Sequence, residues 1–326
     1  MSHETPKLTV CLPVYNAMPH LSDTLASILN QTVRDFHFLL IDDGSTDDSF
    51  AYLQSLDDPR ITLIQQQNQG LTATLNRMLE MVGSGWMIRQ DADDIALPNR
   101  LERIQEYIQR FPNAGMIYSY AGHYQQGGLR GDLLTTATDQ TGLRSFLKKG
   151  YLPSICHPSI ALRVDAALAM GGYRFDLHVE DYDLYWRVGL RYDVHMIPEV
   201  LLGYRMTSSS VSDQNSRKQA TNILYVQYLL LSELWKKRSS TYGEVEPVLQ
   251  RMVDQRHLNF RKHMRTAMGQ FGERRYRSFA FEIAKAFAAS PQSFMTRLLR
   301  QESEGARIGI SPEIFRAQTA LLWPSS

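Results

Sequence analysis

Carboxylates gather at three places in this chain, and these side chains are the best suited to chemistry. They are Asp42-Asp43, Asp91-Ala92-Asp93-Asp94 and Glu180-Asp181. Several carboxylates close together are costly unless a cation neutralises them. Oxygen ligands suit hard divalent ions, so residues 91–94 form a candidate site for Mg²⁺ or Mn²⁺, which could also bridge to a diphosphate. Solvated turn residues, or caps of a helix that begins near Pro98, are the structural alternative, and the pattern alone leaves both open.

The other two groups also have a structural and a catalytic interpretation. Asp43 precedes Gly44, and an Asp-Gly pair is typical of a plain turn; alternatively, the carboxylate accepts hydrogen bonds from a nucleobase or ribose. Glu180 and Asp181 precede an amphipathic stretch, where acidic residues favour a helix N-terminus. Alternatively, one of them is a general base that takes a proton from an attacking hydroxyl. With a phosphate as leaving group, a metal ion can replace the general acid.

Alternating strands and helices are the elements that must position these groups. Buried-strand patterns occupy residues 8–14, 36–41, 61–64 and 86–89, with helical apolar spacing between them. Such alternation predicts a mostly parallel sheet with helices on both faces. Ligands of such sheets bind beyond the carboxyl ends of the strands. Tyr15-Asn16, Asp42-Asp43 and residues 91–94 all follow strand ends, so we expect them along one edge.

The pattern becomes mixed after residue 97 and purely helical after Val211. A helix is predicted at 100–109, strand-like pieces at 115–124 and 158–164, a helix after Glu180-Asp181, and a strand near 194–204. The last region has helical spacing at 216–238, 245–268 and 273–300, without strand signals. We therefore predict an α/β catalytic domain over residues 1–212 and an all-α region over residues 213–326.

Composition is that of an ordinary globular protein: 326 residues, 43% hydrophobic and 21% charged. Cys11 and Cys156 lie far apart and in no metal-type spacing, which favours two reduced thiols. The N-terminus lacks a signal-peptide pattern, and the most apolar stretch, residues 223–235, is too short to span a bilayer. These features predict a cytoplasmic protein.

Charge is unevenly distributed along the chain. Residues 1–212 have 17 Lys and Arg against 24 Asp and Glu, whereas residues 213–326 have 18 against 10. The acidic part suits a protein that holds cations. The basic part, including residues 261–265 with Arg274, Arg275 and Arg277, could make a peripheral contact with the inner face of the cell membrane. A solvated helical surface is the alternative.

Seven ordered segments together resemble the family 2 glycosyltransferases, which have the GT-A fold. The segments are TVCLPVYN (9–16), IDDGSTDDS (41–49), NQGLTATLN (68–76), IRQDADDIALPNRLE (88–102), CHPSIALR (156–163), GGYRFDLHVEDYDLYWRV (171–188) and LGYRMTSSSVS (202–212). The resemblance implies a Rossmann-like catalytic domain that binds a nucleotide-sugar.

The resemblance also implies roles for matching residues. Donor-binding roles fall on Pro13, Tyr15, Asp43, Asn76, Asp91 and Arg205, with Tyr15 against the base and Arg205 near the diphosphate. Asp93 resembles the metal ligand, and Asp181 the catalytic base. Glu180, His157 and Trp186 are candidates for binding the acceptor, although His157 could be structural and Trp186 could belong to the core. Arg89 could pair with Asp91 or with a donor phosphate.

Two positions depart from the family pattern. Thr207 stands where members often have a metal-binding histidine, so the cation would be held by Asp93, diphosphate and water. Leu75 stands where many members have an arginine, which removes a donor contact. The Q-x-x-R-W signature of processive members is absent from the sequence, so we expect one sugar to be transferred per encounter.

Taken together, these residues predict an inverting glycosyltransferase dependent on Mn²⁺ or Mg²⁺. By resemblance, the donor is a UDP-sugar, the acceptor is a saccharide or lipid-linked saccharide, and the setting is bacterial surface polysaccharide or lipopolysaccharide assembly. No nucleic-acid partner is expected. A nucleotidyltransferase is disfavoured because the segment after Val14 has no glycine and no basic residue of a phosphate loop before Arg34. A non-catalytic nucleotide-sugar-binding or scaffold protein is the remaining alternative.

Overall fold

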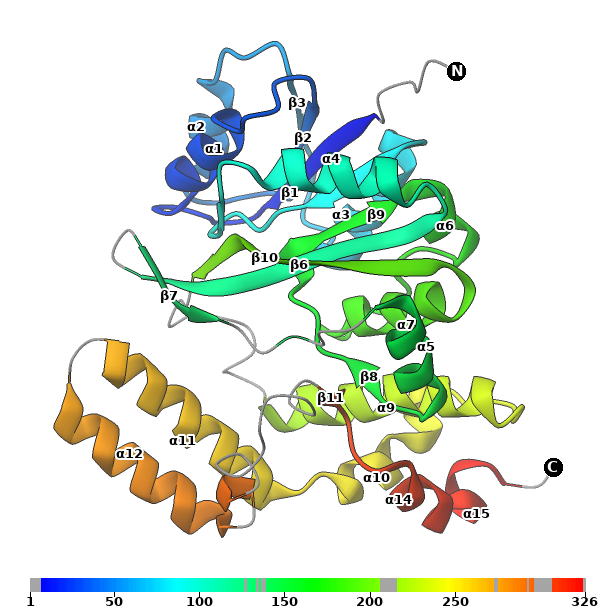
Figure 1. Ribbon diagram of the computed structural model, residues 1–326. Helices are drawn as coiled ribbons and strands as arrows, with labels where there is room; N and C mark the ends of the chain where they lie inside the picture. Colours follow the sequence, from blue (N-terminus) through cyan, green and yellow to red (C-terminus); the bar gives the residue numbers. More distant parts are fainter. Residues whose placement is uncertain are drawn as a thin grey trace. The chain divides into compact units, whose positions relative to one another are not determined.

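The computed structural model describes residues 7–125, 128–132, 135, 139–205, 216–272, 275–291, 293–295 and 307–324. The chain forms two compact units, and each unit is built from several segments of the chain that Figure 1 colours by sequence. The first comprises residues 1–147, 153–176 and 180–206, and the second comprises residues 148–152, 177–179 and 207–326. The boundary predicted at residue 212, and Thr207, lie outside the described residues.

A mixed, mostly parallel sheet forms the first unit. Its strands are β1 (Leu8–Val14), β2 (His37–Asp42), β3 (Ile61–Gln65), β4 (Trp86–Arg89), β5 (Ile95–Ala96), β6 (Ala114–Gln125), β7 (Gly128–Asp132), β9 (Ile160–Arg163) and β10 (Asp193–Arg205). The order is β3-β2-β1-β4-β9-β6-β10-β5, with β7 beside β6. The first four strands run parallel, as predicted, whereas β9 is antiparallel to both β4 and β6.

The strand registers bring several carboxyl ends to one edge of the sheet. Val14 of β1 pairs with Asp42 of β2, and Asp42 pairs in turn with Gln65 of β3. On the other side of β1, Cys11 pairs with Arg89, the last residue of β4. The loops that follow β1, β2 and β4 therefore begin at the same edge, where the sequence pattern predicted them.

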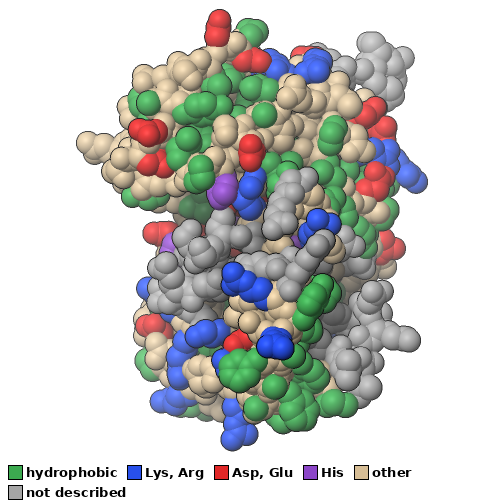
Figure 2. Space-filling view, turned by 90° about the vertical axis from the view of Figure 1, so that its left-hand side faces the viewer, with side chains coloured by type: hydrophobic (Ala, Val, Ile, Leu, Met, Phe, Trp, Pro, Cys, Tyr) green, Lys and Arg blue, Asp and Glu red, His purple; other side chains and the backbone are tan. Residues whose placement is uncertain are grey.

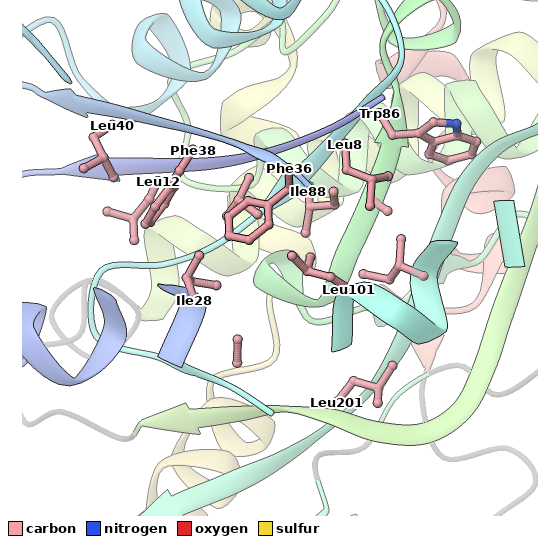
Figure 3. Packing of buried hydrophobic residues seen from close by; sticks show 14 of the residues in the cluster. Leu8, Leu12, Ile28, Phe36, Phe38, Leu40, Trp86, Ile88, Leu101 and Leu201 are labelled. Carbon is pink, nitrogen blue, oxygen red and sulfur yellow. The ribbon is translucent and has the colours of Figure 1, made fainter. Parts of the chain in front are cut away.

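Helices cover both faces of the sheet. They are α1 (Leu21–Leu29), α2 (Ser49–Gln54), α3 (Leu71–Val82), α4 (Arg100–Arg110), α5 (Gln140–Lys148), α6 (Val164–Ala169) and α7 (Glu180–Arg191), with a 3₁₀ turn at His157–Ser159. In Figure 3, Leu12 and Phe38 of the sheet lie near Ile28 of α1, and Ile88 of the sheet lies near Leu101 of α4, all fully buried in one cluster. On the opposite face, α3 packs on β1, β2 and β4. A sheet buried on both faces gives the site a rigid support.

The second unit is mostly helical. Its elements are α9 (Ser216–Leu234), α10 (Tyr242–Met252), α11 (Gln255–Gly272), α12 (Tyr276–Ala289), α14 (Pro312–Ala317) and α15 (Thr319–Leu322), with short strands β8 (Leu152–Pro153) and β11 (Arg307–Ile308). Buried Gln227 of α9 donates to the carbonyls of Gly150 at 2.8 Å and Ile310 at 2.7 Å, and it accepts from Ile310 N at 2.9 Å. One amide thus joins three segments of the unit.

The structure corrects two predictions about this unit. The helix predicted at 245–268 is two helices, because Val253 is extended (φ −74°, ψ 116°) and the Asp254 carboxylate accepts from Arg256 N at 2.9 Å at the start of α11. The prediction of no strand after Val211 was wrong as well. The strand β11 has two residues, too few to show a period in the sequence. None of the described helices is long and apolar enough to cross a membrane.

Candidate active site

The loops after β1 and β2 are joined by Asn16. Its side-chain oxygen accepts from Thr46 N at 2.7 Å and Asp47 N at 3.3 Å, and its own N–H donates to Ser45 Oγ at 3.0 Å. Asn16 adopts φ 49°, a left-handed conformation that asparagine tolerates better than most residues. The neighbouring Tyr15 is 52% exposed, so its ring is open to a ligand at this edge.

Asp43 is held within the protein more firmly than a surface turn residue. It is 4% exposed, and its carboxylate accepts from Gln66 Nε2 at 2.7 Å, Gln69 N at 2.9 Å and Gly70 N at 2.9 Å. A carboxylate offers about four lone-pair sites. Asp43 therefore orders the loop before α3, and at most one lone pair is left for a nucleobase.

A buried arginine lies beneath the carboxylates that follow β4. Arg89 is 1% exposed and donates to Asp91 Oδ1 at 2.5 Å, so the first of its two predicted partners is the one observed. Its guanidinium also interacts electrostatically with Glu180 and Tyr173. Fully buried Arg100 lies alongside and donates to the carbonyls of Arg89 at 2.7 Å and Pro158 at 2.6 Å. Arg100 was not among the predicted site residues, because its place in the sequence is that of an ordinary helical arginine.

The carboxylates of Asp93 and Asp94 carry more negative charge than their surroundings balance. Burial, and then the neighbouring Asp91, raise the pKa of Asp93 to about 6. The same causes raise the pKa of Asp94, whose buried Oδ2 has no hydrogen-bond partner among the described residues. A divalent cation would relieve this excess of charge, so these residues fit the predicted metal. The described residues contain no group of three or more His, Cys, Asp or Glu able to hold a metal, so diphosphate and water would complete its shell.

Arg205 at the end of β10 is fixed on the same loop. Its N–H donates to Asp94 Oδ1 at 2.8 Å, and its Nε donates to the Asp93 carbonyl at 2.8 Å. Nη2 reaches Asp23 Oδ2 at 3.2 Å, and the guanidinium lies 5.2 Å from the centre of the Tyr124 ring. The structure therefore brings Arg205 to the predicted metal ligand, where its positive charge would face a bound diphosphate.

The Glu180-Asp181 pair forms the first turn of α7, close to the residues after β4. Burial, followed by the Glu180 carboxylate, raises the pKa of Asp181 well above its ordinary value. The N–H groups of Asp181 and Tyr182 oppose this rise, and Asp91 adds to it. The Asp181 carboxylate is therefore within electrostatic reach of Asp91, in the segment that follows β4. A carboxyl group with a raised pKa is a stronger base when ionised, as proton abstraction requires.

A buried ion-pair network supports α7 directly behind this turn. Asp183 is 0% exposed and accepts from Arg174 at 2.6 Å and Arg187 at 2.6 Å. Arg187 also donates to the Gly172 carbonyl at 2.7 Å. The sequence analysis missed this network, although the i,i+4 spacing of Asp183 and Arg187 on a helix was a usable signal.

Removing the carboxylate of this network should destabilise the protein strongly. We expect Asp183→Ala to lower the free energy of unfolding by about 3–5 kcal/mol, because it leaves Arg187 buried without a counter-charge. Urea denaturation followed by circular dichroism measures the change. Glu106→Ala, which breaks a more exposed ion pair with Arg103, is the control and should cost about 0–1 kcal/mol. Equal losses for both variants would contradict this account.

Three other predicted site residues are engaged in the fold. Asn76 uses its amide for the Tyr173 backbone, donating to the carbonyl at 2.7 Å and accepting from the N–H at 2.9 Å. His157 Nε2 lies 3.0 Å from Tyr173 Oη, and burial, then Arg89, hold the pKa of His157 well below its usual range. Trp186 is 7% exposed, so its ring is not open to a sugar in this structure. Leu75, which stands where many family members have an arginine, is fully buried in the core.

Comparison with known proteins identifies relatives of a large part of the chain. Residues 9–170 match the family model described as Glycosyl transferase family 2. EpsE of Bacillus subtilis (strain 168), which carries the name of a glycosyltransferase, is 30% identical over 190 residues. The match covers 56% of this chain and 66% of EpsE, so the chain spans about two thirds of that relative.

Two further similarities concern a curated enzyme and a solved structure. The UDP-Gal:alpha-D-GlcNAc-diphosphoundecaprenol beta-1,3-galactosyltransferase of Escherichia coli is 26% identical over 239 residues, covering 70% of this chain and 84% of that protein. The mannosyltransferase PcManGT from Pyrobaculum calidifontis, solved with GDP-Man and Mn²⁺, has a TM-score of 0.53 at 17% identity, covering 91% of this chain and 79% of that chain. The structural likeness confirms the GT-A fold, and a fold alone does not fix a function.

Proposed function

Because the chain belongs to glycosyltransferase family 2, we propose that it transfers one sugar from a nucleotide-sugar to an acceptor hydroxyl with inversion at the anomeric carbon. The observation that carries the proposal is that two groups of carboxylates interact with one buried arginine, Arg89. Arg89 interacts with both Asp91 and Glu180, and Asp181 in turn interacts with Asp91. A donor-holding segment and a candidate base are therefore within electrostatic reach of each other.

The donor occupies the edge where β1, β2 and β4 end. The exposed ring of Tyr15, two residues after Pro13, packs against the base, and the remaining lone pair of Asp43 accepts a hydrogen bond from it. Asp91, fixed by Arg89, contacts the ribose. Arg205 faces the diphosphate because its guanidinium is bound to the loop that contains Asp93.

Asp93 would hold the divalent cation of the proposal. When bound, such an ion stabilises the negative charge that develops on the leaving diphosphate. The chain's own contribution is a carboxylate whose negative charge is only partly balanced by nearby positive charge. Arg205, Arg89 and the backbone keep its loop in place. That arrangement positions the carboxylate before the donor binds, so little reorganisation is needed.

Asp181 takes the proton from the acceptor hydroxyl as that oxygen attacks the anomeric carbon. Burial and the neighbouring Glu180 raise the pKa of Asp181, which increases its basicity towards a hydroxyl. Glu180, 5% exposed beside it, positions Asp181 or binds the acceptor. His157 is neutral and hydrogen-bonded to Tyr173, and its role is to hold the Tyr173 side chain in place within the site. Trp186, predicted as an acceptor platform, has no such role here because its ring is buried.

The substrate classes are inferred from relatives. The Escherichia coli galactosyltransferase is named for a UDP-sugar donor and a diphosphoundecaprenol-linked acceptor. This name supports a UDP-sugar donor for the present chain, and a lipid-linked saccharide acceptor in bacterial surface polysaccharide assembly. Neither Asn76 nor Leu75 supplies a donor contact in our proposal, because both are engaged elsewhere in the fold.

Calorimetric titration tests the donor site without knowledge of the acceptor. We expect one of UDP, GDP and dTDP, with UDP favoured, to bind the wild-type chain tightly with Mn²⁺ and weakly without it. The metal dependence should arise because diphosphate and Asp93 share the cation. If none of the three nucleotides binds with or without Mn²⁺, the non-catalytic scaffold becomes the better account of this chain.

A further inference from the structure

The hairpin of α11 and α12 has a composition unlike the rest of the chain. Its residues 255–289 contain eight Lys and Arg and two Glu, whereas the whole chain is nearly neutral. Of the two acids, Glu282 forms an ion pair within the hairpin with Lys285 Nζ at 2.7 Å, and it also lies 2.7 Å from His263 Nδ1. The hairpin therefore presents a positive surface.

The inner face of this hairpin is already closed. Phe260, Met264 and Ala286 are buried between the two helices, and Ile283 packs against them. This core accounts for the apolar residues that hold α11 and α12 together. At the edge of this core, Phe287 of α12 contacts Phe294, with ring centres 5.5 Å apart, yet Phe287 remains 47% exposed.

The outer face of α12 is apolar with a basic residue in its centre. Phe281 is 62% exposed and Phe287 is 47% exposed. Arg277 lies one helical turn before Phe281 and is exposed on the same stripe, since residues at i and i+4 share a face. The exposed positions between the two phenylalanines include Ala284, which leaves the rings prominent. Exposed aromatic rings of this kind mark interaction surfaces more often than single scattered apolar residues do.

The end of the hairpin repeats this combination of rings and positive charge. Phe271 at the end of α11 is 51% exposed, and Tyr276 at the start of α12 is 60% exposed. Their ring centres lie 6.0 Å apart, so the two form one exposed aromatic pair. Arg275 and Arg277 flank Tyr276 and are exposed as well. In the lower half of Figure 2, hydrophobic and basic side chains accordingly lie next to each other on the surface of the helical unit.

We propose that the α11–α12 hairpin docks this protein onto an anionic lipid surface. The rings of Phe271, Tyr276, Phe281 and Phe287 enter the headgroup layer, and the neighbouring arginines bind lipid phosphates. Aromatic residues favour the membrane–water interface, and basic residues are attracted to anionic leaflets. A second copy of the chain is a poor occupant of this surface, because two equally positive hairpins repel each other. The contact is peripheral, since no described helix can span a bilayer.

Vesicle co-sedimentation of the full chain tests the proposal. The chain should bind phosphatidylcholine vesicles that contain phosphatidylglycerol and remain largely unbound with phosphatidylcholine alone, and added salt should weaken the binding. Phe281→Ser combined with Phe287→Ser should lower the partition coefficient at least about tenfold, because both exposed rings are lost. Arg277→Glu combined with Lys262→Glu should remove the preference for phosphatidylglycerol.

The matched control is Ile314→Ser combined with Leu321→Ser. These side chains are 45% and 55% exposed on α14 and α15, in the same unit but outside the hairpin, and their loss should leave vesicle binding unchanged. Circular dichroism confirms that each variant is folded. The proposal is overturned if wild type ignores anionic vesicles, if the phenylalanine variant binds as well as wild type, or if the control pair loses binding equally. Binding of single-stranded RNA in preference to the vesicles would overturn it too. The test needs neither donor nor acceptor, so its outcome is independent of the proposed sugar transfer.

Discussion

Asp181→Asn should lower the rate of sugar transfer about 10²–10⁴-fold, the range that a positioned general base contributes. The asparagine has nearly the same shape but cannot take a proton from the acceptor hydroxyl. Its effect should appear in kcat, while the affinity for the nucleotide stays close to that of wild type, because the proposed role of Asp181 is towards the acceptor and not the nucleotide. Steady-state kinetics with the donor varied, combined with nucleotide titration, separates the two quantities.

The pH profile gives an independent check on the same residue. Burial and Glu180 raise the pKa of Asp181 in the folded protein, so protonation, which removes the base, occurs at a higher pH than for an exposed aspartate. Transfer should therefore be lost as the pH falls through this raised value and reach a plateau above it. Asp165→Asn, at an exposed carboxylate on α6, is the control. The base assignment fails if Asp181→Asn retains wild-type kcat or if both variants lose activity equally.

Asp93→Ala should have the second-largest effect, on the metal-dependent part of donor use. A cation that stabilises the leaving diphosphate contributes several kcal/mol, which corresponds to a loss of about 10³-fold in the rate of transfer. The variant should also bind nucleotide equally well with and without Mn²⁺. Burial and the neighbouring Asp91 disfavour the charged form of Asp93. Removal of this carboxylate should therefore leave the thermal stability unchanged or slightly increased.

Two results would contradict the assignment of Asp93. One is an Asp93→Ala variant whose nucleotide affinity still rises with Mn²⁺ as in wild type. The other is an equal loss of metal dependence in Asp23→Ala, which removes the exposed carboxylate that contacts Arg205. Asp23→Ala is thus the matched control, because Asp23 is a carboxylate close to the site that is not a proposed metal ligand.

The edge of the sheet that holds the candidate site was predictable, because strong periodic patterns in the sequence end in polar residues there. Buried strands near 8–14, 36–41 and 86–89 were expected from apolar runs. The structure places Tyr15 and Asp43 directly after the first two strands and Asp91 two residues after the third. Parallel alternation then required these ends to share an edge. The helix that begins at Glu180 followed from the acidic first turn and the amphipathic spacing beyond it.

The missed features depend on contacts between distant parts of the chain. Arg100 is buried because the carbonyls of Arg89 and Pro158 surround it, and neither lies near it in the sequence. The antiparallel strand β9 has only four residues, too few to reveal its direction. Asn76 matches a donor-binding position, yet its amide is used by the backbone of Tyr173, almost a hundred residues away. A residue's type and local spacing indicate what it can bind, whereas its actual partner depends on tertiary packing.

The central claim is tested most directly by following the anomeric protons during slow hydrolysis of a UDP-α-sugar by ¹H NMR, with Mn²⁺ and no acceptor. Water then takes the place of the acceptor hydroxyl, so no knowledge of the acceptor is needed. Our account predicts that the β-anomer of the free sugar appears first, at a rate that falls in Asp181→Asn, before mutarotation mixes the anomers. Early appearance of the α-anomer would contradict inversion, and hydrolysis unaffected by Asp181→Asn would contradict the assigned base.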